Sequence, residues 1–497
     1  MMHAHKNLIG AVLCTAALQT AGLPAIAAAD LPLSRDALFD LDEKGGDRPA
    51  AQPHGDEALP GSLKDLFGTD APGQPAAAPT TRQDAPAAVQ TPLPAAASDT
   101  PGIRGYLQTE LAYVYRNPEH WSKTMARLHL GTGGRHEAVK WRFSARLDYN
   151  PVYDLSDHYP KTVRDDDRAR LFVQDAYLDF STGAWDWRVG RQQVVWGEMV
   201  GLFFADVVSA KDLREFILPD FNILRIPQWG VRAEHFGADF HTELLWIPYP
   251  SYDRIGKPGG DFYPYPPILP GLTPIVESER TPARRLKNGN YGLRVAKLIE
   301  GWDLSAFYYD SLDAAAVFPR ELTATTQTYR PRHDRIWQAG GTFGKDLGPF
   351  VLKGELIYTD GRKYNTLDPA DADGLVVQDT LDWVLGADFQ LERDTRINSQ
   401  LFQRIYFDHD PGIIPSRREH GASLLVNHKL RRGWEGEALF IRSLNRNDWL
   451  LRPKLVWKFQ PNWRLAAGVD VLHGPQTGFF GRFSNRDRVY AELRYDF

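Results

Sequence analysis

The sequence has 497 residues, 24% of them charged, and a formal net charge of −5 at pH 7. This length suits two or three ordinary domains or one very large closed sheet. The single cysteine, Cys14, lies in an apolar N-terminal segment that we expect to be removed, which excludes disulfides, thiolate metal sites and covalent haem attachment from the mature chain.

Residues 1–29 are predicted to be a secretory signal peptide. Lys6 precedes an apolar run that ends near Leu23, and small residues around Ala27 suit cleavage. A membrane anchor helix is the alternative, but the run is short and contains Gln19. The signal implies that the mature chain leaves the cytoplasm.

Residues 30–101 are rich in alanine, proline, aspartate and glycine. Up to Thr100 they carry twelve acidic and five basic residues. Such a segment cannot bury enough apolar surface to offset the entropy lost on ordering. We therefore expect a disordered, acidic periplasmic arm, which offers a docking site for a periplasmic partner.

Residues 102–497 alternate between apolar and polar side chains with a period of two. In VKWRFSARLDYN, which begins at Val139, apolar residues alternate with charged or polar ones, the pattern of a strand with one apolar face. About eighteen such runs occur, the first near Gly102 and the last near Asn485. Since a secreted chain without apolar helices can cross a membrane only as a closed barrel, the runs predict an all-β, closed antiparallel transmembrane barrel. We expect about 18 strands, with 16 as the alternative.

The connectors between the runs alternate in length. Short ones such as GTGGRHE, STGA and KDLG alternate with long ones such as 151–169 and 248–288. Outer-membrane barrels have short periplasmic turns and long external loops, with aromatic girdles at both interfaces. The last strand, RVYAELRYDF, ends on Phe497 and resembles the C-terminal signature of bacterial outer-membrane proteins, which the barrel-insertion machinery reads. Both features predict an outer-membrane location.

The polar side chains of these runs lie on the opposite face of each strand from the apolar ones, and we expect them to line the interior of the barrel. Fixed charges along a water-filled pore select solutes of opposite charge, and the strands at the closing seam are rich in cations, so we expect passage of anionic solutes to be favoured. A lumen of mutually paired charges is the alternative. The predicted pore-lining basic residues are Arg104, Lys123, Arg127, Lys140, Arg142, Arg146, Arg488 and Arg494. The predicted pore-lining acidic residues are Glu110, Asp148, Asp175 and Asp179.

The connector 197–226 is too apolar for a solvated loop. Ser209 is a helix N-cap candidate, and the residues after it have helical spacing, which predicts a helix in this loop. A loop of this length with an apolar face is expected to fold into the barrel mouth, with packing on the rim as the alternative. The residues expected near the constriction are Asp206, Lys211, Arg214 and Glu215.

The region Arg188–Glu234 contains RVGRQQVVWGE, ADVVSAKDLREFIL and RIPQWGVRAE. These stretches resemble a proteobacterial outer-membrane family described only as a domain of unknown function. That family is similar in style to porins and alginate-export barrels, and some of its genes lie beside exporter genes of the resistance-nodulation-division type. The resemblance implies an outer-membrane barrel and export of a lipid or polymer, and it supplies no binding residues.

The leading hypothesis is therefore a channel that gives passive, charge-selective passage to small or anionic solutes. One alternative is an export conduit for a lipid or acidic polysaccharide that works with a periplasmic or inner-membrane exporter. Another is a structural sheath for a redox partner. The sequence has no Gly-x-Ser-x-Gly motif, so we expect no enzyme activity, and we expect no cofactor, no bound metal and no nucleic-acid partner. The expected partners are outer-membrane lipid, the insertion machinery, which would read Phe497, and a periplasmic protein that docks on the arm.

Overall fold

The computed structural model describes residues 102–197, 199, 205–237, 239–392 and 394–497. All described residues belong to one compact unit. The predicted signal peptide and acidic arm lie outside the described residues. No helix in the described part of the chain is long and apolar enough to span a bilayer.

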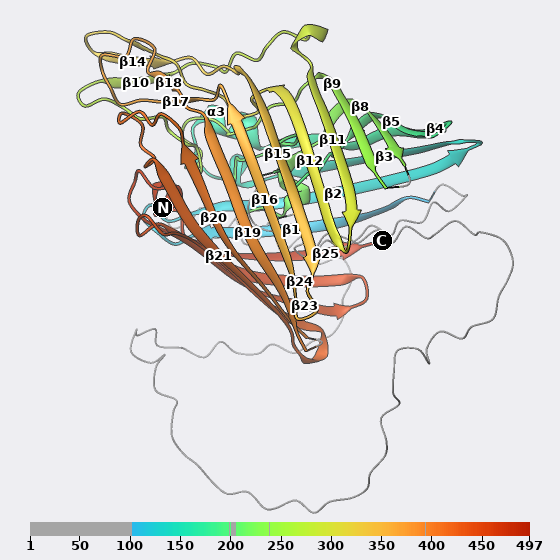
Figure 1. The fold of residues 1–497 in the computed structure, drawn as a ribbon. Helices are drawn as coiled ribbons and strands as arrows, with labels where there is room; N and C mark the ends of the chain where they lie inside the picture. Colours follow the sequence, from blue (N-terminus) through green and yellow to red (C-terminus); the bar gives the residue numbers. More distant parts are fainter. Residues whose placement is uncertain (1–101, 198, 200–204, 238, 393) are drawn as a thin grey trace, which may run out of the picture. The chain divides into compact units, whose positions relative to one another are not determined.

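Eighteen antiparallel strands form one sheet that closes on itself (Figure 1). The first strand, β1 (Arg104–Val114), pairs with the last, β25 (Arg488–Asp496), so neither strand leaves a free edge. This closure confirms the predicted all-β barrel and its 18 strands. The other barrel strands are β2 (His120–His136), β3 (Val139–Tyr149), β4 (Ala169–Thr182), β5 (Trp185–Gln192), β8 (Gln228–Phe236), β9 (His241–Tyr249), β11 (Asn290–Ile299), β12 (Trp302–Leu312), β15 (Arg335–Asp346), β16 (Phe350–Asp360), β19 (Thr380–Leu391), β20 (Thr395–Tyr406), β21 (Arg418–Lys429), β22 (Trp434–Ser443), β23 (Trp449–Gln460) and β24 (Trp463–His473).

Smaller elements lie in the loops between the barrel strands. The loop strands β10, β14, β17 and β18 gather at one end of the barrel (Figure 1). The loop strands are β6 (Ala210–Lys211), β7 (Arg225–Ile226), β10 (Thr273–Val276), β13 (Arg320–Leu322), β14 (Thr326–Tyr329), β17 (Lys363–Asn365) and β18 (Leu375–Val377). The helices are α2 (Val152–Leu155), α3 (Lys161–Asp167), α4 (Phe221–Leu224) and the 3-10 turns η2 (Leu286–Asn288), η3 (Arg431–Gly433) and η4 (Gly481–Phe483).

The connectors segregate by length, as the sequence predicts. At one end of the barrel, the short-turn end, two to four residues join successive strands. At the other end, the long-loop end, the connectors are longer, and the longest runs from Pro250 to Gly289. One predicted turn is wrong. The stretch GTGGRHE is largely strand, because β2 continues to His136 and turns only at Glu137 and Ala138.

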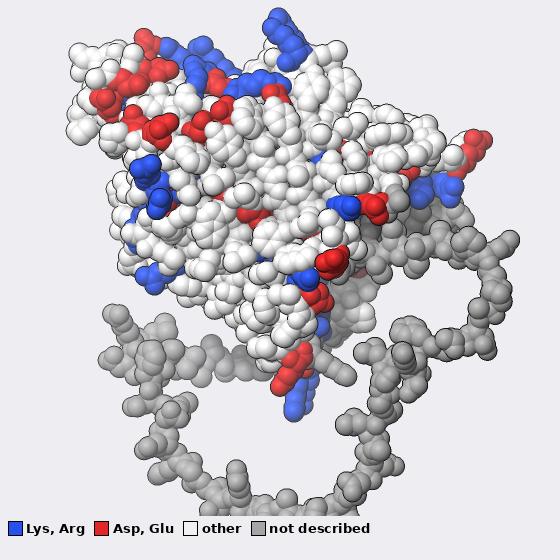
Figure 2. All heavy atoms as spheres, in the orientation of Figure 1, with Lys and Arg blue, Asp and Glu red and all other residues white. Residues whose placement is uncertain are grey.

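Alternate side chains of each strand face opposite sides of the barrel wall. In β12, the side chains of Leu304 and Tyr308 point outward and are 36% and 46% exposed. Phe307 and Tyr309, on the opposite face of the strand, are buried against a loop inside the barrel. Figure 2 shows that the face in view is mostly uncharged over the strands, with charged side chains gathered over the loops and at strand ends. An apolar outside and a polar inside are what a barrel in a lipid bilayer requires.

Aromatic rings gather on the outside at both ends of the barrel. At the short-turn end, Trp434 and Trp457 stack with ring centroids 5.0 Å apart, and the rings of Trp463 and Tyr495 lie 4.8 Å apart. At the long-loop end, Trp337 lies between Tyr308 and Tyr358, with centroid distances of 5.8 and 5.4 Å. These two groups match the interfacial aromatic girdles of membrane barrels.

Candidate channel lumen and constriction

The loop between β5 and β8 is anchored to one inner wall by an apolar cluster. Its residues Val194, Trp196, Ala205 and Val208 pack against lumen-facing residues of β9, β12 and β16, namely Leu245, Ile247, Phe307, Tyr309 and Ile357. The Trp196 Nε1 also donates a hydrogen bond to Glu243 of β9 at 3.1 Å. The apolar composition of the loop is therefore explained by a matching apolar strip on the inside of the barrel.

A single carboxylate reinforces this anchor. Glu355 of β16 accepts hydrogen bonds from the backbone amides of Met199 at 3.0 Å and Ala205 at 2.9 Å. Glu355 is only 3% exposed. Hydrogen bonds to a charged acceptor are stronger than neutral ones, so this contact holds the backbone of Met199 and of Ala205 against β16.

Replacing Glu355 by alanine should loosen the loop. The change leaves two amides without their acceptor, and an unsatisfied buried donor costs about 1–3 kcal/mol. We expect a lower free energy of unfolding and faster tryptic cleavage at Lys211. Glu321→Ala, on the exposed hairpin strand β13, is the control, and equal cleavage rates in the two variants would show that Glu355 does not hold the loop.

The tip of the same loop reaches the opposite wall. Phe216 and Leu218 join a second apolar cluster with Ile441, Leu450 and Leu472 of β22, β23 and β24. The two clusters place the loop across the lumen, from one wall to the other.

The predicted helix at Ser209 is absent. Ala210 and Lys211 instead form β6, which pairs with β7, and the chain between them folds back through turns and the four-residue helix α4, which begins only at Phe221. Phe216 has a φ of 56°, in the left-handed region, which a right-handed helix does not allow. The positive φ lies at the position where the Phe216 ring enters the second cluster.

Glu215 of the loop tip forms ion pairs with two cations of the seam strands. Its carboxylate lies 2.5 Å from Lys123 Nζ of β2 and 3.2 Å from Arg488 Nη1 of β25. Burial alone would raise the pKa of Glu215, but Lys123 and Arg488 lower it to about 2. The stabilisation is therefore complete above the ordinary pKa of 4.5 and is lost as the pH falls through about 2.

The seam strands carry a continuous network of ion pairs. Glu110 of β1 accepts from Lys123 at 2.7 Å and also pairs with Arg127 of β2. Asp148 of β3 pairs with Arg127 at 2.8 Å and with Arg146 at 3.0 Å. These side chains are almost completely buried, so each charge is balanced within the wall or by the loop.

The network continues on the other side of the seam. Asp470 of β24 is fully buried and accepts from Arg452 and Arg488, each at 2.8 Å. Of the predicted residues, the structure thus brings Lys123, Arg127, Arg146, Arg488, Glu110, Asp148 and Glu215 into one network. Next to it lies a cavity of about 70 Å³, room for several water molecules, lined in part by Asp212 and Arg214.

The remaining loop residues pair mainly within the loop. Asp206 accepts from Arg225 at 2.8 Å, and Lys211 Nζ donates to the carbonyls of Asp206 and Ser209 at 3.1 and 2.9 Å. Arg214 pairs with Asp212 at 2.5 Å. Arg214 also pairs with Asp167, the last residue of α3, at 2.7 Å. This ion pair connects the loop to the loop between β3 and β4.

The other predicted wall residues lie nearer the short-turn end, outside the network. Arg142 pairs with Asp175 at 3.2 Å, and Asp179 pairs with Arg188 at 2.7 Å. Lys140 and Arg104 are exposed near the ends of their strands. Arg494 pairs with Asp496 at 2.6 Å and lies over the Tyr106 ring, 3.7 Å from its centroid.

The sequence analysis missed the acidic partners Asp470 and Glu355. Asp470 stands between two valines in VDV, on the same parity as the lumen-facing cations, and this position could have revealed it. Glu355 is likewise a buried carboxylate on a barrel strand, β16. Nothing in the sequence shows that its partners are backbone amides of a distant loop.

A family described as a protein of unknown function (DUF1302) matches residues 121–399, more than half of the chain and the whole region around the loop. The chain belongs to this family. Membership in DUF1302 confirms the resemblance seen in the sequence. No curated protein matches the chain.

Several solved structures are similar to this DUF1302 chain. OccAB1 of Acinetobacter baumannii has a TM-score of 0.51 at 8% identity, covering 84% of this chain and 99% of its own. OccK8 (OprE) of Pseudomonas aeruginosa has a TM-score of 0.48 at 9% identity, covering 81% and 99%. The outer membrane channel DcaP of Acinetobacter baumannii has a TM-score of 0.40 at 10% identity, covering 80% and 97%. The likeness to OccAB1 shows a shared barrel fold.

Proposed function

We propose that the protein is an outer-membrane channel that gives small solutes passive, charge-selective passage, with a preference for anions. The observation that carries this proposal is a closed barrel with an apolar outside and an ionic inside, narrowed by one loop that is anchored on two walls. In a membrane barrel of this kind the lumen charges set which solutes pass. The short turns and both ends of the sheet would face the periplasm.

The preference for anions is supported by the cations beyond the paired network. Arg464 of β24 and Arg494 of β25 are direct cross-strand partners near the short-turn end, and both lie on the lumen-facing parity. Like charges directly opposite each other destabilise a strand pair, so an anion passing close to them is favoured. Arg494 also pairs with Asp496 at 2.6 Å, so the two arginines and this carboxylate together leave one excess positive charge in the lumen at this end. Nearer the middle, the acids of the loop tip and Asp470 balance the cations.

The double variant Arg464→Glu/Arg494→Glu should shift the selectivity towards cations. We expect the reversal potential in planar bilayers under a KCl gradient to move in that direction, because the change replaces two positive lumen charges with two negative ones. Arg284→Glu/Arg285→Glu, in an exposed loop, alters the net charge equally and is the control. A parent channel that prefers cations, or equal shifts in both double variants, would contradict the assignment.

We further propose that Phe497 remains accessible to the barrel-insertion machinery. Its backbone pairs with Gly105 of β1 in both directions at 2.9 Å, which closes the barrel at the short-turn end. Its ring is nevertheless 47% exposed, beside Tyr495. A C-terminal aromatic ring in this position is available for recognition from the periplasmic side.

A further inference from the structure

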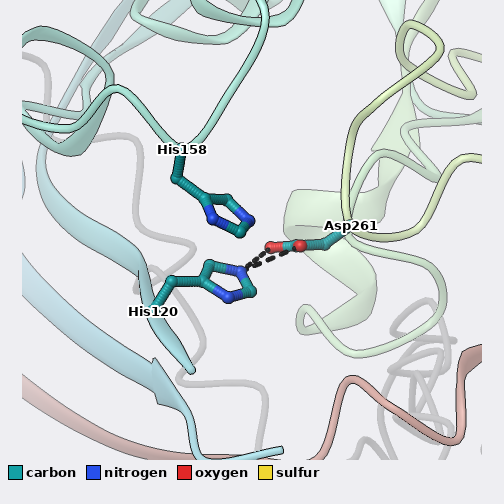
Figure 3. A group of neighbouring side chains, drawn as sticks. All are labelled: His120, His158 and Asp261. Carbon is teal, nitrogen blue, oxygen red and sulfur yellow. Dashed lines mark hydrogen bonds and ion pairs between the residues drawn. The ribbon is translucent and has the colours of Figure 1, made fainter. Parts of the chain in front are cut away.

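Three potential metal ligands from distant parts of the sequence meet at the long-loop end of the barrel (Figure 3). His120 is the first residue of β2, His158 lies between α2 and α3, and Asp261 lies in the loop between β9 and β10. One ligand atom from each lies within 4.8 Å of the others. The sequence analysis expected no bound metal; these residues are 38 or more positions apart and form no motif.

The hydrogen bonds of His120 fix which of its nitrogens faces the carboxylate. Its Nδ1 lies 2.7 Å from the carbonyl oxygen of Pro118, and since a carbonyl can only accept, Nδ1 carries the proton. In the neutral ring, Nε2 then presents a lone pair to the Asp261 oxygens, at 3.0 and 3.2 Å. Two lone pairs so close together require a cation between them, either a proton or a metal ion.

The spacing of these atoms suits a metal ion. Two ligands at about 2.0–2.1 Å from a tetrahedral zinc ion are about 3.3 Å apart, close to the observed Nε2 to oxygen distances. A backbone carbonyl that holds the other ring nitrogen is also the usual outer support of a metal-binding histidine. The His120 side therefore has both the distance and the tautomer that coordination needs.

The carboxylate is oriented by two other donors. The Tyr159 hydroxyl donates to Asp261 Oδ2 at 2.7 Å, and Arg486 pairs with Oδ1 at 3.1 Å. Because each carboxylate oxygen accepts at more than one lone pair, both contacts are compatible with coordination. Ligating carboxylates in metal sites are commonly held in this way.

His158 supplies the third position. Its ring stacks on His120 with centroids 3.8 Å apart, so it must tilt to bring a nitrogen onto a shared ion. His158 is exposed, and its neighbours on the chain form a loop, so the ring has room to move. Its two partners, by contrast, are held in place by the contacts already described.

We propose that His120, His158 and Asp261 bind one divalent transition-metal ion of the zinc, nickel or copper class. Imidazole with a carboxylate is a ligand set that these ions accept, and three protein ligands leave a position for water or a solute. The ion would join the start of β2, the 150–168 loop and the 250–289 loop. This proposal does not depend on the channel function.

The test is metal binding to the full chain, purified without a polyhistidine tag, in detergent micelles after chelator treatment. We expect calorimetric titration with Zn²⁺ to show one site, and Cu²⁺ at the same site to show imidazole nitrogen coupling in its electron paramagnetic resonance spectrum. His158→Ala should weaken Zn²⁺ binding by at least about tenfold, since even outer-shell changes cost 10–100-fold. Because His158 is exposed, this variant is expected to fold.

The matched control is His473→Ala. His473 also lies at the long-loop end of a strand and also stacks on an aromatic ring, that of Trp449, but it is not part of the cluster. The His473→Ala variant should bind Zn²⁺ with the same affinity as the parent. If the parent binds no ion, or if both variants bind equally well, the proposal is overturned and the cation between His120 and Asp261 is a proton.

Discussion

Replacing residues 212–224 with Asn-Gly should raise the single-channel conductance severalfold. β6 and β7 are already paired, with Lys211 opposite Arg225, so a two-residue turn can close the shortened hairpin. The replacement removes Glu215 and Phe216, and with them the contacts to the far wall, but retains the Trp196 anchor. Conductance in planar bilayers measures the effect.

The charge of the loop tip and its volume can be separated with Glu215→Gln. This variant keeps the chain across the lumen and removes only the ion pairs with Lys123 and Arg488. Its conductance should therefore remain close to that of the parent. If the shortened channel conducts no better than the parent, the loop does not form the narrowest part of the lumen.

Asp470→Ala should be the most destabilising single substitution among the ion pairs of the wall. Asp470 has no exposed surface, and its loss leaves Arg452 without an ion-pair partner among the described residues and Arg488 with Glu215 alone. Removing one partner of a buried ion pair costs about 3–5 kcal/mol, because the remaining charge is buried without compensation. Urea unfolding of protein refolded into liposomes, followed by tryptophan fluorescence, gives the free energy of unfolding.

The matched control is Asp154→Ala, at an exposed ion pair with Arg168 in the loop after β3. Exposed pairs contribute between zero and about 1 kcal/mol, so the control should unfold almost as the parent does. Asp470→Asn keeps the shape of the side chain, so its free energy of unfolding should lie between those of Asp470→Ala and the control. Equal stability of Asp470→Ala and the control would mean that water in the lumen solvates the two arginines.

The sequence predicts the barrel well because its determinants are local. Alternation of side chains across each strand, the length of each connector and the terminal aromatic residue are all visible without knowing the fold. The misplaced turn at GTGGRHE has a specific cause. Gly134 is next to the Trp141 side chain of β3, where a Cβ would lie 3.1 Å from the ring, so the glycine makes room for the aromatic residue within the sheet.

The charge pairs were beyond prediction because their partners depend on register and on the loop. Counting along the seam strands finds an excess of cations, but the acidic partner Glu215 lies in the loop, and Asp470 lies on β24, opposite Arg488 of β25. The parity of a residue shows that it faces the lumen, not which side chain it meets there. The predicted helix was wrong for a related reason, since the second apolar cluster determines the conformation at Phe216.

The attachment through Glu355 has a consequence for how such channels can diverge. A carboxylate that binds main-chain N–H groups is indifferent to side-chain identity, because every residue except proline offers the same donor. The side chains at positions 199 and 205 can therefore change, to any residue except proline, without loss of this contact with the wall. A pore could in this way acquire new permeability while its scaffold stays intact.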